Sequence, residues 1–210
     1  MTRTIAFLSG VLLCVGVASA QYADFTLSGG YSHFYPEHSG GLNFSKEGAF
    51  VDGDFAFRVP GPVPLFAGVG LSASGYWESS DFWFVDNNNF VQDRTLWSDV
   101  ETVAVEPRLA VKLKIPGLEG FFVKPMIGAG LLVDDYAIDT PSVINNVTFI
   151  QTFNHTGAAF EIRPAIEAGW SNRGLTFGGV VSYMAAWGGF GQMGDMMQEL
   201  RVGLFVGFRF

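Results

Sequence analysis

The sequence has almost no cysteine and few charged residues. Cys14 is the only cysteine among 210 residues, and it lies close to the N-terminus. If that segment is removed, the remaining chain has no disulfide framework, no thiol nucleophile and no cysteine-based metal site. Charged residues make up 15% of the chain, whereas a typical soluble domain has about 25%. The net charge of −8 argues against a nucleic-acid partner, because phosphate binding needs clustered Lys and Arg.

Residues 1–20 have the features of a secretory signal peptide. Arg3 gives a positive start, residues 5–17 are apolar, and Ala18-Ser19-Ala20 fits the small-residue cleavage pattern. The alternative is an uncleaved anchor helix, which the short apolar run disfavours. We therefore expect a signal peptide over residues 1–20 and a single mature domain over residues 21–210.

Beyond this segment the dominant hydrophobic period is two, which is typical of β-strands. In residues 103–115, for example, Val105 and Leu109 fall on one face and Glu106 and Arg108 on the other. Strong alternation predicts strands at residues 51–59, 103–115, 158–170 and 200–210, and weaker, glycine-rich strands are predicted at 22–34, 65–77, 121–133 and 175–187. About eight strands result, each long enough to cross a bilayer when tilted. A ten-stranded count is the less favoured alternative.

The predicted connections alternate between short and long. Residues 60–64, 116–120 and 172–174 are short turns, and residues 35–43, 78–97, 136–155 and 188–197 are longer. Short periplasmic turns and long extracellular loops are typical of outer-membrane barrels. Asn87–Asn89 and Asn145-Asn146 are candidate hairpin tips that would prolong strands beyond the membrane.

The alternation alone does not say which face meets solvent, since a soluble barrel would keep its apolar face inside. We favour the inverted arrangement because Glu-x-Arg recurs at residues 106–108, 161–163 and 199–201, while neighbouring strands carry small residues on the same face. Buried charges need partners, so we predict a charge network in the lumen. Its members are Asp52, Asp54, Arg58, Glu106, Arg108, Lys112, Glu161, Arg163, Glu167, Glu199 and Arg201.

Aromatic residues near the predicted strand ends would form belts at the two membrane interfaces. Those near the long loops are Tyr31, Tyr35, Trp77, Trp97, Tyr136 and Trp187, and those near the short turns are Phe121, Trp170 and Phe210. Three prolines on the apolar face, Pro107, Pro125 and Pro164, would each remove a ladder donor, and we interpret them as bulges.

The signal peptide, the eight amphipathic strands and the ending at Phe210 resemble the small OmpA/OmpX-type outer-membrane barrels, including OmpW-like ones. The final alternation is similar to the C-terminal signal read by the outer-membrane assembly machinery; it consists of Val202, Leu204, Val206, Phe208 and Phe210. The resemblance implies an all-β, closed, antiparallel up-and-down transmembrane β-barrel located in the outer membrane. It further implies contact with outer-membrane lipid, lipopolysaccharide and the assembly machinery, but no particular activity and no particular extracellular ligand.

The residues offer little catalytic chemistry. Lipid-modifying barrel enzymes use His with Ser and an acid, but Ser32 and His33 are strand neighbours and face opposite ways. His38 precedes Ser39 near the outer end of the first predicted hairpin, and His155 stands at the start of the predicted sixth strand. The acidic loop residues, such as Asp99, Asp134 and Asp139, match no calcium-loop spacing. We therefore predict no catalytic site, no metal site and no cofactor.

Three functional hypotheses remain from different classes. The leading one is a structural or surface-interaction protein with a charge-filled lumen and exposed loops, one of which has an aromatic tip at residues 82–91. The second is a narrow channel for small or hydrophobic solutes. Its lining would be the apolar residues of inward parity, which are Phe50, Phe66, Phe122, Met126, Leu132 and Phe205. The third is a lipid-modifying enzyme.

Overall fold

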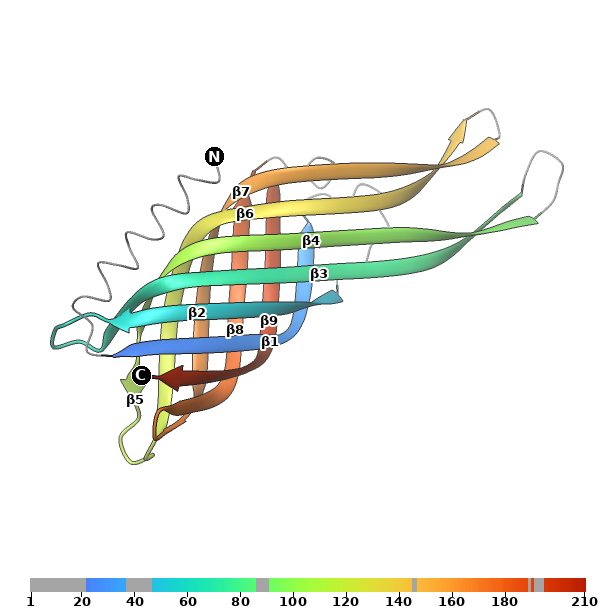
Figure 1. Ribbon diagram of the computed structural model, residues 1–210. Helices are drawn as coiled ribbons and strands as arrows, with labels where there is room; N and C mark the ends of the chain where they lie inside the picture. Colours follow the sequence, from blue (N-terminus) through green and yellow to red (C-terminus); the bar gives the residue numbers. More distant parts are fainter. Residues whose placement is uncertain (1–21, 37–46, 86–90, 145–146, 189, 191–194) are drawn as a thin grey trace.

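The computed structural model describes residues 22–36, 47–85, 91–144, 147–188, 190 and 195–210, and every regular element in them is a β-strand (Figure 1). The strands are β1 (Ala23–Pro36), β2 (Glu47–Arg58), β3 (Leu65–Val85), β4 (Val91–Val111), β5 (Leu113–Lys114), β6 (Phe121–Ile144), β7 (Val147–Asn172), β8 (Leu175–Trp187) and β9 (Met196–Arg209). The predicted signal peptide lies outside the described residues. In the part of the chain that is described, no helix is long and apolar enough to span a membrane.

The strands form one closed antiparallel barrel. Neighbours in the sheet follow the order β4-β3-β2-β1-β9-β8-β7-β6-β5, and pairing of β4 with β6 closes the ring. The short β5 continues β4 past Lys112 in the same register against β6, because Ala110 pairs with Met126 and Leu113 with Val123. Because β4 and β5 together form one strand of the ring, the barrel wall has eight strands. This confirms the predicted fold class and the eight-strand count.

The strands are staggered, as closure of a barrel requires. A path of cross-strand partners can be followed around the barrel from Leu27; it runs through Gly53, Leu71, Val105, Leu131, Phe160, Trp187 and Met196. Met196 directly precedes Met197, the partner of Pro36. The path thus returns to β1 about ten residues beyond its start, and a barrel of this size has an interior that side chains just fill.

The predicted bulges at the three prolines are wrong. The β4–β6 register is the same on both sides of Pro107, and the β7–β8 register is the same on both sides of Pro164. Pro125 is directly paired with Ile166 on β7. All three prolines face outward, and the strands tolerate the lost donors without inserting a residue.

The outer wall is apolar and the charges face the interior, which is the reverse of a soluble barrel. Outward-facing Leu71, Ile166 and Leu204 are 57%, 54% and 75% exposed, whereas Glu106 is fully buried. The five alternating residues of the C-terminal segment, Val202 to Phe210, all point outward. Such a wall fits hydrocarbon surroundings, because exposed apolar bands of this kind are found on membrane barrels.

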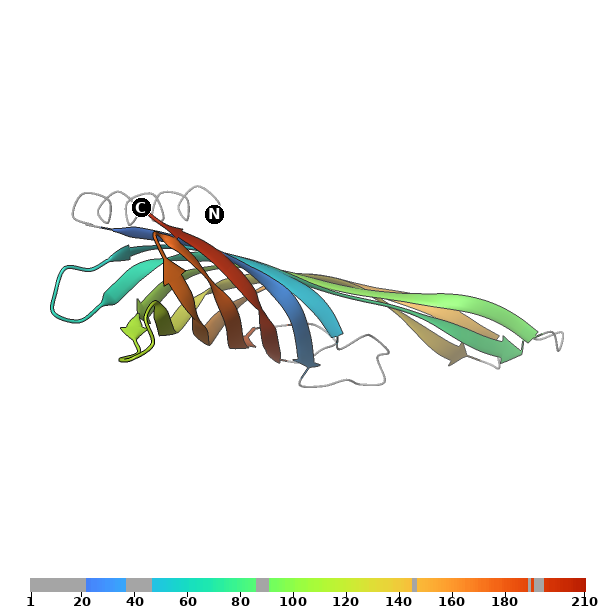
Figure 2. The same ribbon diagram turned by 90° about the horizontal axis from the view of Figure 1, so that it is seen from below.

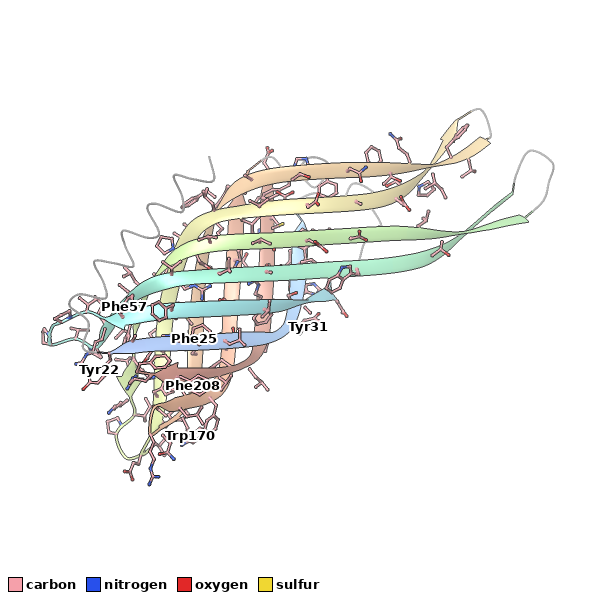
Figure 3. All side chains as sticks on the ribbon, in the orientation of Figure 1. Tyr22, Phe25, Tyr31, Phe57, Trp170 and Phe208 are labelled. Carbon is pink, nitrogen blue, oxygen red and sulfur yellow. The ribbon has the colours of Figure 1, made fainter. Side chains whose placement is uncertain are left out.

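Large aromatic side chains are exposed near both ends of the barrel (Figure 3). Tyr31 and Trp187 lie toward the long-loop end, and Tyr22 and Trp170 toward the short-turn end. Tyr136 was wrongly assigned to this belt. It is 4% exposed, and its hydroxyl donates a hydrogen bond to the backbone oxygen of Phe190 at 3.3 Å inside the barrel.

Four consecutive long strands make one side of the barrel taller than the other (Figures 1 and 2). Strands β3, β4, β6 and β7 have 21, 21, 24 and 26 residues, against 12 to 14 in β1, β2, β8 and β9. We call the part of these four strands beyond the barrel the extended wall. The β4–β6 pairing ends at Ser98 and Ile138, and beyond it two hairpins continue separately.

Residues 78–97 and 136–155, predicted as long loops, are therefore mostly strand. Strand pairing reaches Val85 with Val91 and Ile144 with Val147, so the alternative in which strands continue toward asparagine tips is confirmed. The asparagines themselves lie outside the described residues. The asparagines were the sequence signal for these hairpins; the period-two pattern gave none in the β3–β4 segment, where polar residues interrupt strict alternation.

A charge on the outer wall is expected to destabilise the barrel in a bilayer. Val181 is the central residue of β8 and faces outward between Ile166 and Val202. We expect Val181→Arg to lower the free energy of unfolding by about 2–4 kcal/mol, measured by denaturant titration in lipid vesicles, and Val181→Leu to leave it nearly unchanged. Equal stability of the two variants would mean that this face does not meet hydrocarbon.

Candidate functional site

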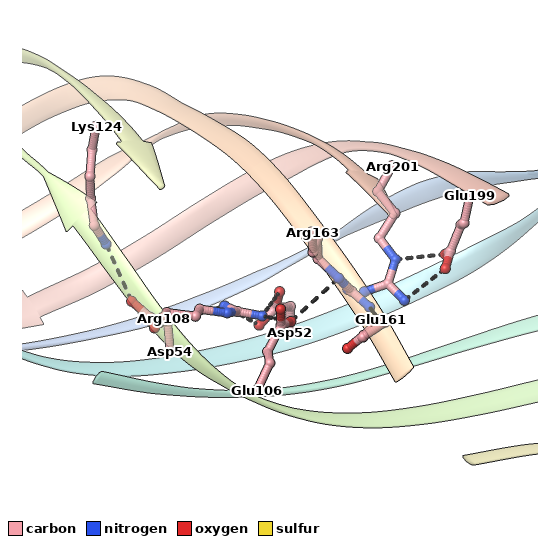
Figure 4. Close-up of polar contacts among 9 residues, drawn as sticks. All are labelled: Asp52, Asp54, Glu106, Arg108, Lys124, Glu161, Arg163, Glu199 and Arg201. Carbon is pink, nitrogen blue, oxygen red and sulfur yellow. Dashed lines mark hydrogen bonds and ion pairs between the residues drawn. The ribbon is translucent and has the colours of Figure 1, made fainter. Parts of the chain in front are cut away.

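The centre of the barrel is filled by a group of paired charges, which we call the central ion network (Figure 4). Its members are Asp52, Asp54, Glu106, Arg108, Lys124, Glu161, Arg163, Glu167, Glu199 and Arg201. They come from β2, β4, β6, β7 and β9 and belong to the inward-facing series of each strand. Side chains at alternate positions of a strand share a face, so each Glu-x-Arg motif presents both charges to the lumen.

Arg108 is the hub on one side of the network. Its guanidinium donates to both carboxylate oxygens of Asp52, at 2.9 and 2.7 Å, and to Oε1 of Glu106 at 2.6 Å. Asp54 lies 3.8 Å away. Bidentate charge-assisted bonds of this kind are strong and fix the orientation of both groups, so β2 and β4 are held together across β3, which lies between them.

Glu106 connects the charges of β4 with those of β7. Its Oε1 accepts from Arg108 and also lies 3.3 Å from Nε of Arg163 on β7. Arg163 donates to Oε2 of Glu161 at 2.8 Å. Farther along, Arg201 donates to both oxygens of Glu199, at 2.6 and 2.9 Å. A buried carboxylate that contacts arginines of two different strands is a structural cross-link, because leaving either arginine unpaired costs several kcal/mol, roughly 3–5.

Lys124 forms a second branch that the sequence analysis did not include. Its Nζ lies 3.3 Å from Oδ2 of Asp54 and 3.3 Å from Oε2 of Glu167, and it is 2% exposed. The alternation of the strand could have indicated its inward orientation, because Phe122 and Met126, two positions away on either side, were both predicted to face inward. Asp24 and Arg209 were missed in the same way; Nε of Arg209 lies 2.7 Å from Asp24.

Glycines on the intervening strands make room for these long side chains. A Cβ atom built on Gly70 of β3 would overlap the guanidinium of Arg108, and one built on Gly128 of β6 would overlap the carboxylate of Glu106. The predicted interplay of small and long residues is therefore realised in the packing. The space left at the network is a cavity of about 10 Å³ among residues that include Asp52, Arg108 and Arg163, which is room for about one water.

Apolar side chains close the lumen on both sides of the network. Toward the long-loop end, a buried cluster contains Phe34, Tyr76, Leu132, Ile138, Met184 and Phe190 among its members. A second cluster contains Phe50, Phe122, Val180 and Phe205, and a third packs Met126 against Ala56, Phe66 and Ala110. The residues proposed to line a channel thus face inward, but they are distributed over three separate packed clusters.

Two members of the predicted network lie at the short-turn end instead of the centre. Lys112 pairs with Asp24, with Nζ 3.6 Å from its carboxylate. Arg58 faces inward but, among the described residues, no carboxylate forms an ion pair with it. Both line a cavity of about 610 Å³ that opens at this end of the barrel.

The histidine and acidic residues do not assemble into a recognisable reaction centre in the described part of the chain. Ser32 is buried whereas His33 points outward beside Tyr31 and Tyr35, so the two do not form a nucleophile–base pair. His155 lies 3.6 Å from the buried Asp134 and stacks on Tyr136. Within the described ranges no three His, Asp or Glu side chains are grouped to hold a metal ion. His38 lies outside the described residues.

Loss of the Glu106 charge is expected to destabilise the barrel strongly. Glu106→Gln keeps the shape of the side chain but removes the anion shared by Arg108 and Arg163. We expect the free energy of unfolding to fall by about 3 kcal/mol or more, measured by denaturant titration in detergent. The control is Glu101→Gln on the same strand, an exposed outward carboxylate, which should have almost no effect. A similar small effect of both changes would contradict the cross-linking role.

Comparison with known proteins identifies the fold. No family model matches the chain, and no curated protein matches it in sequence. Among solved structures, it is similar to Ail, the attachment invasion locus protein of Yersinia pestis, with 11% identity, 90% of this chain and 98% of that chain covered, and a TM-score of 0.50. Neisserial surface protein A gives 9% identity, 90% and 97% coverage and a TM-score of 0.50. The N-terminal β-barrel domain of Pseudomonas aeruginosa OprF gives 12% identity, coverage of 91% of this chain and 98% of that chain, and a TM-score of 0.41. Together with the eight-stranded topology, the likenesses to Ail and to neisserial surface protein A show that the chain has the fold of the small bacterial outer-membrane β-barrels.

Proposed function

We propose that the protein is an integral outer-membrane barrel with a structural or surface-interaction role and a lumen that does not conduct. The apolar outer wall, the aromatic residues near both ends and the predicted signal peptide support the location. In this arrangement the short-turn end faces the periplasm and the extended wall faces the exterior. We further propose that the outward residues Val202 to Phe210 are the segment that the assembly machinery recognises.

The observation that carries the proposal is the filled interior. A conducting lumen would need a continuous path, but the central ion network leaves about 10 Å³ and apolar clusters close the barrel on both sides of it. The ions of the network connect five strands, with Lys124 of β6 paired to Asp54 of β2, so opening a path would require several buried pairs to separate together. A narrow channel is the weaker hypothesis for this reason.

The extended wall supports the surface role. Its outward face carries exposed polar side chains, including Glu101, Asp135 and Asn154, and two of its aspartates are held by threonines. Thr156 donates to Asp135 at 2.8 Å and Thr152 to Asp139 at 2.7 Å. A polar sheet of this height outside the bilayer offers a rigid surface to lipopolysaccharide or to an extracellular partner.

The names of the structural neighbours are consistent with such a role but do not carry it. Ail is named for attachment and invasion, and the neisserial protein is named as a surface protein. These names describe those proteins, and at identities of 11% and 9% the likeness concerns the fold. The proposal for this chain rests on its own closed lumen and extended wall.

We expect no ion conductance from the purified protein in planar lipid bilayers. The physical reason is the absence of a continuous aqueous path through the described interior, so the current should remain at the level of the protein-free membrane across the voltages tested. Refolding must be checked by circular dichroism before reconstitution. Reproducible single-channel steps would overturn the non-conducting role and favour the channel hypothesis.

Orientation can be tested by labelling single cysteines on intact bacterial cells. Asn154 is exposed on the extended wall and Glu119 is exposed in a short turn. We expect a membrane-impermeant maleimide to label Asn154→Cys on intact cells and Glu119→Cys only after the outer membrane is permeabilised. The unsubstituted protein gives the background. Labelling of Glu119→Cys on intact cells, with Asn154→Cys protected, would reverse the proposed orientation.

A further inference from the structure

The cavity at the short-turn end differs in character from the rest of the interior. It measures about 610 Å³ and opens to the outside of the barrel, within the range of small-molecule sites, roughly 300–1,000 Å³. The features that matter are the basic residues Arg58, Lys112, Lys114 and Arg209 and the rings of Phe66 and Phe122. They come from β2, β3, β5, β6 and β9, and Lys112 lies between β4 and β5, so the cavity is built by most of the barrel.

The cavity has an excess of positive charge. Its described lining contains four basic side chains and no carboxylate. Asp24 stands just behind the wall and is shared by Arg209, at 2.7 Å, and Lys112, at 3.6 Å. Arg58 and Lys114 form no ion pair with any described carboxylate. This concentration of cations occurs in a protein whose net charge is −8, so it is not a consequence of general composition.

Lys124, the next cation toward the centre of the barrel, differs from the cavity cations in its pairing. It is buried between Asp54 and Glu167, at 3.3 Å from each, so its charge is fully matched within the protein. Each of the four cations of the central ion network thus has a carboxylate partner, whereas Arg58 and Lys114 in the cavity beside it have none among the described residues. Concave, low-dielectric walls lined by one sign of charge focus the field and attract counter-ions.

The floor of the cavity is apolar. Phe66 is 4% and Phe122 is 2% exposed, and the ammonium of Lys112 lies 4.0 Å from the ring centroid of Phe122 in a cation–π contact. A ligand that fits both parts has an anionic head and an apolar body. Arginine forks bind phosphate and carboxylate oxygens bidentately, while lysine adds point charges.

We propose that this cavity is a binding site for an amphiphilic organic anion, with a phosphate or carboxylate head held by Arg58, Lys114 and their basic neighbours and an apolar body against Phe66 and Phe122. The ligand enters from the short-turn side, which the orientation proposed above places in the periplasm. The same chemistry is offered by a free periplasmic anion and by the head group of an anionic lipid in the inner leaflet.

The test is a titration of the folded mature protein in a non-ionic detergent, followed by isothermal calorimetry. The probes are hexyl phosphate, inorganic phosphate and hexanol. We expect hexyl phosphate to bind more tightly than inorganic phosphate, and hexanol not to bind measurably. The double variant Arg58→Gln/Lys114→Gln should bind hexyl phosphate at least tenfold more weakly. Neither residue belongs to the central ion network, so the variant is expected to fold, which circular dichroism checks.

The matched control is Arg173→Gln, which removes one positive charge at the same end of the barrel but outside the cavity, in the exposed turn between β7 and β8. Its affinity for hexyl phosphate should equal that of the unsubstituted protein. Unchanged affinity in the double variant, an equal loss in Arg173→Gln, or equal binding of hexanol would each overturn the proposal, as would equal affinity for inorganic and hexyl phosphate.

The source of the ligand is separated by a second measurement. The protein is reconstituted in nanodiscs of phosphatidylcholine with phosphatidylglycerol, and the lipids that remain bound on release are counted by native mass spectrometry. Retention of phosphatidylglycerol by the unsubstituted protein and its loss in the double variant supports the lipid head group. Hexyl phosphate binding without lipid retention supports a free anion. Neither readout depends on conductance or on surface labelling, so this proposal and the proposed function can fail separately.

Discussion

Charges inside an eight-stranded barrel must be paired across a space that is only a few side chains wide, and the interior of this protein is arranged around that constraint. Glu106 contacts Arg108 of its own strand and Arg163 of β7, which is separated from β4 by β6. Gly70 and Gly128 leave the space these side chains occupy. The pairing holds strands together between the apolar clusters of the interior, while many other large apolar side chains lie on the outer wall.

The constraint also divides the lumen along its axis. The central ion network gives each of its cations a carboxylate partner and leaves space for about one water. Toward the long-loop end, apolar residues such as Phe34 and Ile138 seal the barrel. At the short-turn end the same inward-facing series supplies more cations than acids, and the interior widens into a cavity of about 610 Å³. A closed centre and an open basic end can therefore coexist in one barrel.

The extended wall is a consequence of unequal strand lengths around a closed ring. Strands β3, β4, β6 and β7 remain paired well past the ends of β2 and β8, so their backbone groups continue to be satisfied outside the barrel. The outer face there carries exposed polar side chains such as Asp135 and Asn154, so the continuous apolar band of the barrel wall ends before it. The same strands thus form part of the closed barrel at one end and two hairpins beyond it at the other.

The strand count, the antiparallel closed fold and the facing of residues in the predicted strands follow from the amino-acid pattern alone, because a period of two assigns side chains to faces without knowledge of neighbours. The same pattern indicates which charges share the lumen, since Glu106 and Arg108 are separated by two positions on one strand. The register emerges only when the strands are assembled in three dimensions. Register determines that Lys124 reaches Asp54 and Glu167, that Arg58 has no described carboxylate partner, and that β3 and β4 pair beyond Trp77. These depend on stagger between strands far apart in the chain, and a local pattern carries no information about it.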